Sequence, residues 1–299
     1  MTITLRLLFL VIFIITCAED KGLNNFDKNI YTGSDSTLDI ITWNIENFPK
    51  ENEITIDYLV EIIDSLNIDV IAMQEIGDDN AFNQLLSALI GWNGIRTSGS
   101  WGLAFIYRSE LEINRIEEIQ ALDNYNLART PLLMELVWGS EIIYIINNHY
   151  KCCGNGTIEI VYDDEEYRRL QSCILTKSYI DSNLSSDNVI LLGDFNDELN
   201  DPDSSNVFLS FIYDNNNYLF VDERIANGSS ANWSYPSWPS HLDHILITNE
   251  LFDEFNQSES GVHTIHIEDY FEDGWNEYEK YISDHRPVGL SLFFNQIQN

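Results

Sequence analysis

Basic side chains are scarce in this sequence: 15 Lys and Arg stand against 49 Asp and Glu among 299 residues, giving a formal net charge of −34. Proteins that bind duplex nucleic acid tightly present a basic surface, because neutralising phosphates supplies most of the affinity. The composition therefore argues against tight, salt-sensitive DNA binding, although it permits an enzyme that turns substrate over. We expect most of the carboxylates to form a solubilising surface suited to salty surroundings.

Apolar runs long enough to span a bilayer are also missing. Residues 7–15 form an apolar stretch behind Arg6 that is too short to cross a membrane and instead predicts an export signal. The stretch leads to Cys17 in an imperfect match to a bacterial lipobox. We expect an extracytoplasmic protein, either secreted after ordinary signal cleavage or lipid-anchored at the bacterial surface through Cys17. The predicted division of the chain is a signal peptide at 1–17, a polar tether at 18–36 and one folded domain at 37–299.

Cysteine is rare as well, with only four in the chain. Besides Cys17 these are Cys152, Cys153 and Cys173. An oxidising compartment permits disulfides, and a ring between adjacent cysteines is strained, so we expect a bridge from Cys152 or Cys153 to Cys173. Three reduced thiols are the alternative, which the odd number supports.

Hydrophobic periodicity predicts the fold class. Apolar residues at helical spacing alternate with strand-like runs in the first half, and strands dominate later. This order is typical of an α/β sandwich of two sheets flanked by helices. The predicted helices lie near 54–66, 80–90 and 163–181. The predicted strands lie near 37–45, 69–74, 103–108, 132–138, 142–148, 189–192, 218–221, 244–248, 264–267 and 288–294.

Polar residues follow the strand-like runs at six places. Turns favour Asp and Asn, but six such blocks that together supply carboxylates, amides and imidazoles are hard to explain by turns alone. Such a set suits a pocket that holds a hard divalent cation, orients a water and neutralises a phosphoryl group. The blocks are TWNIEN (42–47), QE (74–75), NH (148–149), GDFND (193–197), LDH (242–244) and SDHRPV (283–288).

The ordered set resembles the endonuclease/exonuclease/phosphatase superfamily, which includes deoxyribonuclease I, AP endonucleases, neutral sphingomyelinases and inositol polyphosphate 5-phosphatases. The resemblance covers residues 37–295, and it is carried by GDFND and SDHRPV in combination. It implies two packed sheets with the site at one edge, and metal-assisted hydrolysis of phosphate esters. Mg²⁺ or Mn²⁺ is the implied cofactor, and a structural Ca²⁺ is a further candidate.

The resemblance also implies a role for each of nine residues. Independently of it, a carboxylate directly after the buried run 70–73 is costly unless it meets a cation, and strand alternation places Asp194 and Asn196 on one side. The implied metal ligands are Glu75 and Asp284; the implied catalytic residues are His285, Asp243 as its orienting partner, Asp194 for the water and His149 for the phosphate; the implied substrate-binding residues are Asn44, Asn196 and Arg129.

Two features bear on the substrate. His149 argues against an AP endonuclease, and Trp101 stands where deoxyribonuclease I has a glutamate that orients this histidine. The aromatic loop 232–239 suits base stacking, lipid insertion or plain packing equally well.

The expected activity is therefore phosphodiester hydrolysis, with nucleic acid as the expected substrate and partner. A lipid or inositol phosphate hydrolase is the main alternative, favoured if the aromatic loop is exposed. A non-enzymatic binding module is disfavoured, because it has no need for both Asp243 and His285. The sequence indicates no protein partner.

Overall fold

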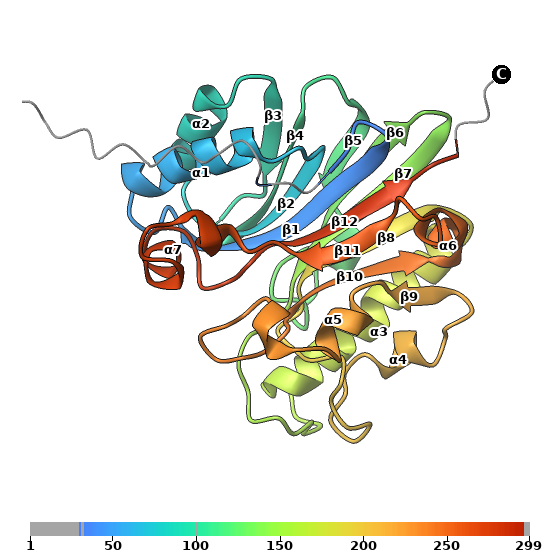
Figure 1. Cartoon of the computed structure of the whole chain (residues 1–299). Coiled ribbons are helices and arrows are strands. Elements are labelled where there is room, and N and C mark those ends of the chain that lie inside the picture. Colours follow the sequence, from blue (N-terminus) through green and yellow to red (C-terminus); the bar gives the residue numbers. More distant parts are fainter. Residues whose placement is uncertain (1–29, 31–32, 100, 296–299) are drawn as a thin grey trace, which may run out of the picture.

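The computed structural model describes residues 30, 33–99 and 101–295. Two six-stranded sheets pack face to face (Figure 1), which confirms the predicted α/β sandwich. Sheet A has the order β11-β12-β1-β2-β4-β3 and sheet B the order β5-β6-β7-β8-β10-β9. The strands of sheet A are β1 (Thr37–Phe48), β2 (Val70–Ile76), β3 (Trp92–Arg96), β4 (Gly102–Arg108), β11 (Gly261–Thr264) and β12 (Val288–Phe293). Those of sheet B are β5 (Glu112–Glu118), β6 (Leu132–Trp138), β7 (Glu141–His149), β8 (Asn188–Asp194), β9 (Tyr218–Phe220) and β10 (Asp243–Thr248).

The central strands are buried on both faces. Alternate residues of β1, such as Leu38 and Ile40, point between the sheets, where they meet Ile190 and Leu192 of β8 in one apolar cluster. The other face of each sheet is covered by helices, which explains why these strands are almost continuously apolar. The pairs β1–β2 and β7–β8 are parallel, and all other neighbouring strands are antiparallel.

Helices cover the outer faces of both sheets (Figure 1). Helices α1 (Glu53–Ser65), α2 (Asp79–Ala88) and α7 (Trp275–Tyr281) pack on sheet A, and α3 (Glu165–Asn183) packs on sheet B. The Asp164 side chain accepts a hydrogen bond from the backbone N–H of Tyr167 at 2.7 Å and so caps α3, as expected for an acidic run at a helix N-terminus. None of the helices in the described part of the chain combines the length and apolar character needed to span a membrane. Short helical turns fill the connections: α4 (Leu209–Ile212), α5 (Glu223–Ala226), α6 (Phe252–Phe255), η1 (Gln120–Leu122), η2 (Ser230–Asn232), η3 (Asn249–Leu251) and η4 (Ile267–Tyr270).

A buried amide bridge joins the two sheets just beneath the site. Asn147 of β7 donates through Nδ2 to the carbonyl oxygens of Met73 and Ala104, each at 3.0 Å. Its Oδ1 accepts a 2.7 Å hydrogen bond from Nε2 of Gln74 on β2. Both amide side chains are fully buried. Buried polar groups are costly unless they are bonded, so this pair fixes how the sheets dock.

Register and bulges bring the polar residues to one edge. On sheet B, His149 pairs with Asp194 and Asp194 pairs with Asp243, so three adjacent strands present these residues in one row. On sheet A, the β1–β2 register shifts after Asn44, and Glu75 adopts a left-handed φ of 64°. Bulges of this kind re-aim side chains at active sites.

The predicted disulfide to Cys173 is wrong, because Cys152, Cys153 and Cys173 are all free. Helix α3 turns Cys173 into the apolar cluster under sheet B, where it lies with Tyr150 and Phe195. The loop after His149 turns the other two thiols the opposite way, toward a cavity at the edge of the sandwich.

Candidate active site

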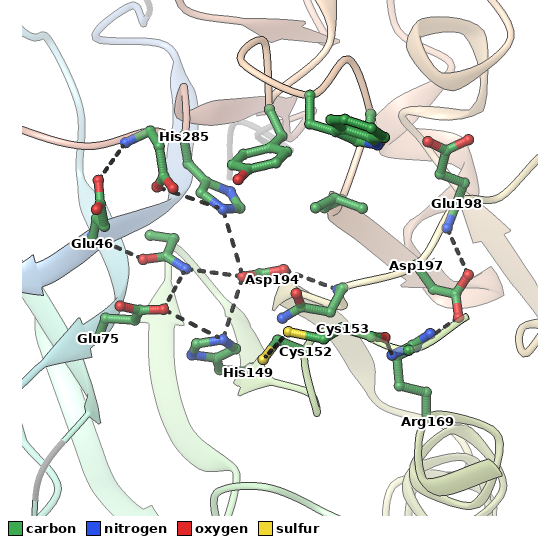
Figure 2. A pocket seen from close by; sticks show the side chains of 18 of the residues that line it. Glu46, Glu75, His149, Cys152, Cys153, Arg169, Asp194, Asp197, Glu198 and His285 are labelled. Atoms are coloured by element: carbon green, nitrogen blue, oxygen red, sulfur yellow. Dashed lines mark hydrogen bonds and ion pairs between the residues drawn. The ribbon is translucent and has the colours of Figure 1, made fainter. Parts of the chain in front are cut away.

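A cavity of about 610 Å³ opens at the edge where the polar strand ends meet (Figure 2). Of the two predicted residues that do not line it, Asp243 lies fully buried behind His285 and Arg129 lies to one side. The other seven predicted residues line the cavity: Asn44, Glu75, His149, Asp194, Asn196, Asp284 and His285.

Asp243 and His285 form the expected dyad. Oδ2 of Asp243 lies 2.7 Å from Nδ1 of His285. The imidazole is also held through its backbone, whose N–H donates to Oγ of Ser283 at 2.9 Å. Because Nδ1 faces the carboxylate, Nε2 faces the cavity. The second carboxylate oxygen of Asp243, Oδ1, is buried and has no hydrogen-bond partner among the described residues.

Asp194 lies at the centre of the site (Figure 2). Its Oδ2 accepts a 2.9 Å hydrogen bond from Nδ2 of Asn44. The same oxygen lies 3.4 Å from Nε2 of His149 and 4.0 Å from Nε2 of His285. Its Oδ1 accepts from the backbone N–H of Asn196 at 2.9 Å. One carboxylate therefore links the ends of both sheets to two imidazoles.

The crowded carboxylates give the site an excess of negative charge. Burial is the largest cause that raises the pKa of Asp194, to about 7; His285 opposes the effect and Asp243 adds to it. Burial disfavours the imidazolium of His285, but Asp243, Asp194 and Asp284 together raise its pKa to about 10. The raised pKa of His285 thus reflects the surrounding carboxylates, whereas that of Asp194 reflects burial first.

Oxygen donors suitable for a hard cation lie around Glu75. Its Oε2 accepts from the backbone N–H of Asn47 at 2.9 Å, and its Oε1 accepts from Nδ2 of Asn44 at 3.3 Å. Glu46, which the motifs leave without a role, lines the cavity and accepts from the backbone N–H of Asp284 at 3.1 Å. Carboxylates and amides are the ligands that Mg²⁺ and Mn²⁺ prefer. Glu75, Asp284 and Glu46 all line the cavity, so their side chains have the chemistry that such an ion requires.

His149 lacks the partner that would orient it. Its Nε2 lies 3.9 Å from Oε1 of Glu75, whereas its buried Nδ1 has no hydrogen-bond partner among the described residues. Burial, then the positive charges of Arg129 and His285, hold the pKa of His149 well below its usual value. Trp101 lines the cavity nearby, and its carbonyl oxygen accepts from Nε of Arg129 at 3.1 Å. Among the described residues, none of these neighbours offers an acceptor to Nδ1 of His149.

The aromatic loop serves both packing and the cavity. Nε1 of Trp233 donates to the carbonyl of Ile225 at 3.0 Å, which anchors the loop. The ring of Tyr235 lies 4.9 Å from the ring of His285, measured between centroids. Trp238 is 77% exposed and lines the cavity. Trp233 therefore packs the loop onto the domain, whereas the rings of Tyr235 and Trp238 lie at the cavity.

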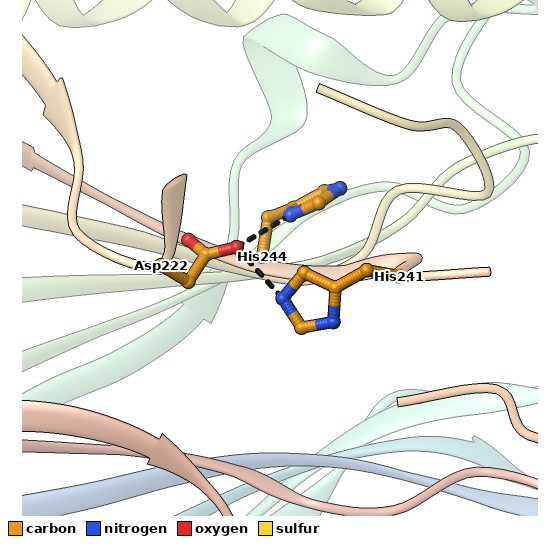
Figure 3. A group of neighbouring side chains, drawn as sticks. All are labelled: Asp222, His241 and His244. Carbon is orange, nitrogen blue, oxygen red and sulfur yellow. Dashed lines mark hydrogen bonds and ion pairs between the residues drawn. The ribbon is translucent and has the colours of Figure 1, made fainter. Parts of the chain in front are cut away.

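A second titratable cluster supports strand β10 from behind (Figure 3). Oδ2 of Asp222 lies 2.6 Å from Nδ1 of His244 and 3.1 Å from Nε2 of His241. The remaining nitrogen of His244 lies 2.9 Å from the carbonyl oxygen of Asp197, and that of His241 accepts from the backbone N–H of Ser234 at 3.2 Å. Every ring nitrogen is thus committed to a protein partner, which makes the cluster a structural brace rather than a metal centre.

The sequence motifs did not predict this brace. The signal for it was a pair of histidines, His241 and His244, at the start of the buried strand β10. Burial opposes ionisation of Asp222, but His244 and His241 hold its pKa well below its usual range. The pKa of His244 is raised, because Asp222 outweighs the effect of burial. The ion pair ties together β10, the aromatic loop and the GDFND loop.

Arg169 holds the loop that follows His149. Of the neighbouring Arg168 and Arg169, Arg169 is the buried one. Its Nε lies 2.7 Å from Oδ2 of Asp197. Its Nη1 donates to the carbonyl oxygens of Lys151 and Cys153 at 2.9 and 2.7 Å. Arg168 instead lies 4.2 Å above the ring of Tyr125.

Comparison with solved structures shows the same fold. D. rerio TDP2, solved with a single-strand DNA product, is 14% identical with a TM-score of 0.65 over 86% of this chain and 99% of that chain. The human Nocturnin catalytic domain with a bound sulfate anion is 16% identical with a TM-score of 0.61 over 87% and 96% of the two chains. An endonuclease/exonuclease/phosphatase family protein from Bacteroides thetaiotaomicron is 16% identical with a TM-score of 0.59 over 87% and 98%.

Sequence comparison identifies the family. A search of curated proteins gave no match. The profile of the Endonuclease/Exonuclease/phosphatase family, in contrast, matches residues 41–285, which include every predicted site residue. Members of this family are hydrolases of phosphodiesters or phosphate esters and generally depend on a divalent metal. The chain belongs to the endonuclease/exonuclease/phosphatase family.

Proposed function

We propose that this protein is a divalent-metal-dependent phosphodiesterase that cuts nucleic acid endonucleolytically outside the cytoplasm. The observation that carries the proposal is the row of Asp243, His285 and Asp194, with 2.7 Å between Asp243 Oδ2 and His285 Nδ1 and with Nε2 facing the cavity. A histidine held in one orientation by a carboxylate is suited to proton transfer with water.

The chain's own residues provide the following chemistry. Asp243 keeps the Nδ1 proton of His285 in place, so Nε2 is the nitrogen that exchanges a proton with the attacking water or the leaving oxygen. The carboxylates that raise the pKa of His285 favour the form in which Nε2 holds this proton. Asp194, fixed by Asn44 and by the backbone of Asn196, orients that water. Neutral His149 and Asn196 would donate hydrogen bonds to phosphate oxygens.

A divalent cation held by Glu75, with Asp284 and Glu46 nearby, would supply the Lewis-acid charge that stabilises phosphate and leaving oxygen. The same charge would balance the carboxylates that surround the cavity.

Nucleic acid is the proposed substrate. The relative from D. rerio was solved with a single-strand DNA product, and the exposed ring of Trp238 can stack on a base. Few cations of the described residues lie at the cavity: Arg169 lines it but is paired with Asp197, and Arg129 and Lys151 lie close enough to His149 to affect its charge. Binding should therefore be weak. Its salt dependence should be shallower than that of proteins making six to ten phosphate contacts, which lose roughly 10³–10⁵ in affinity between low and moderate salt.

A lipid or inositol phosphate hydrolase is the second candidate. The observation in its favour is Trp238, whose 77% exposure at the cavity rim would suit contact with a membrane interface. It shares the proposed catalytic residues and differs only in what the rim binds.

The test is conversion of supercoiled plasmid to nicked and linear forms with Mg²⁺ or Mn²⁺, beside RNA, sphingomyelin, inositol phosphates and bis-p-nitrophenyl phosphate. Glu75→Gln, assayed at a metal concentration that is enough for the wild type, is the control with reduced activity, and Glu112→Gln, on the exposed edge strand β5, is the matched active control. Hydrolysis of sphingomyelin or an inositol phosphate with DNA and RNA left intact would replace the nuclease by the second candidate.

Export and anchoring are proposed from the sequence alone, because residues 1–29 lie outside the described part of the chain. Mass spectrometry of the mature N-terminus tests them. A lipidated Cys17 at the new terminus is the expected result, and an unmodified terminus further along the chain would exclude the anchor.

A further inference from the structure

We infer that Cys152 and Cys153 form a redox-active dithiol that closes reversibly to a disulfide on the wall of the catalytic cavity and lowers activity when closed. The two Sγ atoms lie 2.9 Å apart, and both residues line the cavity that holds the dyad. Figure 2 shows the sulfur atoms side by side, below Asp194 in this view. The effect on activity rests on the proposed function; the closure itself does not.

The backbone holds the pair in this arrangement. Cys153 has a left-handed φ of 75°, a conformation that residues other than Gly, Asn and Asp adopt only when their surroundings impose it. Here Arg169 imposes it, since its Nη1 binds the carbonyls of Lys151 and Cys153 on the two sides of the pair.

The turn that follows the pair is fixed as well. Oε1 of the buried Glu166 accepts hydrogen bonds from the backbone N–H groups of Asn155 and Gly156. Gly154 is required at the bend, because it has a φ of 115° and a Cβ there would collide with the Glu166 carboxylate. A loop anchored on both sides keeps the thiols together without help from a bond between them.

The three described thiols differ in solvent exposure, and this difference supports reversible oxidation of Cys152 and Cys153 alone. Cys153 is exposed and Cys152 is partly exposed, so a small oxidant can reach them. Cys173 is buried, which protects it and makes it an internal reference. Redox-sensing cysteines are accessible and lie next to a resolving thiol.

Closure is a balanced thiol–disulfide exchange with a small-molecule disulfide as oxidant. The thiolate of one cysteine attacks the oxidant, forming a mixed disulfide and releasing one thiol. The neighbouring thiolate then attacks the mixed disulfide, closes the Sγ–Sγ bond and releases the second thiol. The protein loses two S–H hydrogens, and the oxidant is reduced to two thiols. Because a ring between adjacent cysteines is strained, the bond should be readily reduced.

Closure would reach the catalytic residues through two short connections. Cys152 follows His149 by three residues, so movement of the loop shifts the strand end that carries the imidazole. The carbonyl of Cys153 shares Arg169 with Asp197 of the GDFND loop, which carries Asp194 at its start. Small displacements of catalytic groups reduce rates strongly, because reaction requires near-contact geometry.

The test uses the full chain with Cys17→Ser, equilibrated in glutathione buffers from fully reduced to fully oxidised and then digested for peptide mapping. We expect loss of two hydrogens in the peptide that contains Cys152 and Cys153, and full alkylation of Cys173. Hydrolysis of bis-p-nitrophenyl phosphate should fall about tenfold or more and recover with dithiothreitol. Cys153→Ser, at an exposed position, should retain activity in every buffer.

A glutathione adduct that persists without ring closure, or a linkage to Cys173, would overturn the closure. A closed pair with unchanged activity, or equal inhibition of Cys153→Ser, would overturn its effect on the site. If the reduced protein hydrolyses none of the phosphate esters tested, the proposed function fails, whereas the peptide map still decides the closure.

Discussion

Replacement of Asp243 by asparagine is the sharpest perturbation of the site. It exchanges one carboxylate oxygen for an NH₂ group, and each of the two orientations of the new amide has a cost. If the amide oxygen faces Nδ1 of His285, the amide NH₂ occupies the place of Oδ1, which has no partner. An unsatisfied buried donor costs about 1–3 kcal/mol. If the NH₂ group faces Nδ1, the imidazole must carry its proton on Nε2 and can no longer accept one from water.

The second choice keeps the protein stable but removes the base, so we expect it to dominate. The rate should fall by roughly 10²–10⁴-fold, which is about 2.7–5.4 kcal/mol at 1.36 kcal/mol per factor of ten. Thermal unfolding should show a loss of no more than about 3 kcal/mol. The assay is kcat/KM on bis-p-nitrophenyl phosphate, with Asp253→Asn on the exposed surface as the matched control.

The double variant separates a dyad from two independent residues. His285→Ala alone should cost as much as Asp243→Asn, and the pair little more than the worse single change, because Asp243 acts only through the imidazole. Losses that multiply would refute this reasoning. So would an Asp243→Asn protein with ordinary activity and a folded spectrum.

Three further predictions follow from other parts of the molecule. Wild-type activity should vanish in EDTA, and Glu75→Gln should need more Mg²⁺ or Mn²⁺ for half-maximal rate; EDTA-resistant activity would contradict the metal site. Asn147→Leu should lose about 2–5 kcal/mol of unfolding free energy and roughly 5–15 °C in Tm, because two carbonyl oxygens and the Gln74 amide lose their partner. A loss below about 1 kcal/mol would show that the amide bridge is dispensable. Burial raises the pKa of Asp69 to about 6, so the folded state binds this proton more tightly than the unfolded state, and stability should fall as pH rises from about 4 to 6. Asp69→Asn should remove part of this slope when Tm is measured against pH. An unchanged slope would contradict the assignment.

The architecture could be predicted because the central strands are buried on both faces and therefore strongly apolar. The predicted strand at 132–138 matches β6, and the predicted helix at 54–66 matches α1 within one residue. Strands β3 and β5 were missed for the opposite reason. They lie at sheet edges, and β5 alternates weakly among charged residues such as Arg115 and Glu117, which single-sequence patterns do not separate from loops.

The site residues were found because their motifs are short and each ends a strand. What the sequence could not predict is which contacts cross between distant segments. Asn147 was overlooked because its role depends on Met73 and Ala104 in the other sheet. The disulfide prediction failed because spacing says nothing about the direction in which α3 turns Cys173.

The first and last strands of the sandwich are neighbours, and this has a consequence for how the protein is made. In the ribosomal order of synthesis, β1 emerges early but its partner β12 comes 240 residues or more later, with Thr42 pairing with Val288. Sheet A stays open along that edge until the far end of the chain has left the ribosome. Contacts so distant in sequence slow folding. His285 lies just before β12, so a chain that stops short of this strand lacks one partner of the Asp243–His285 pair.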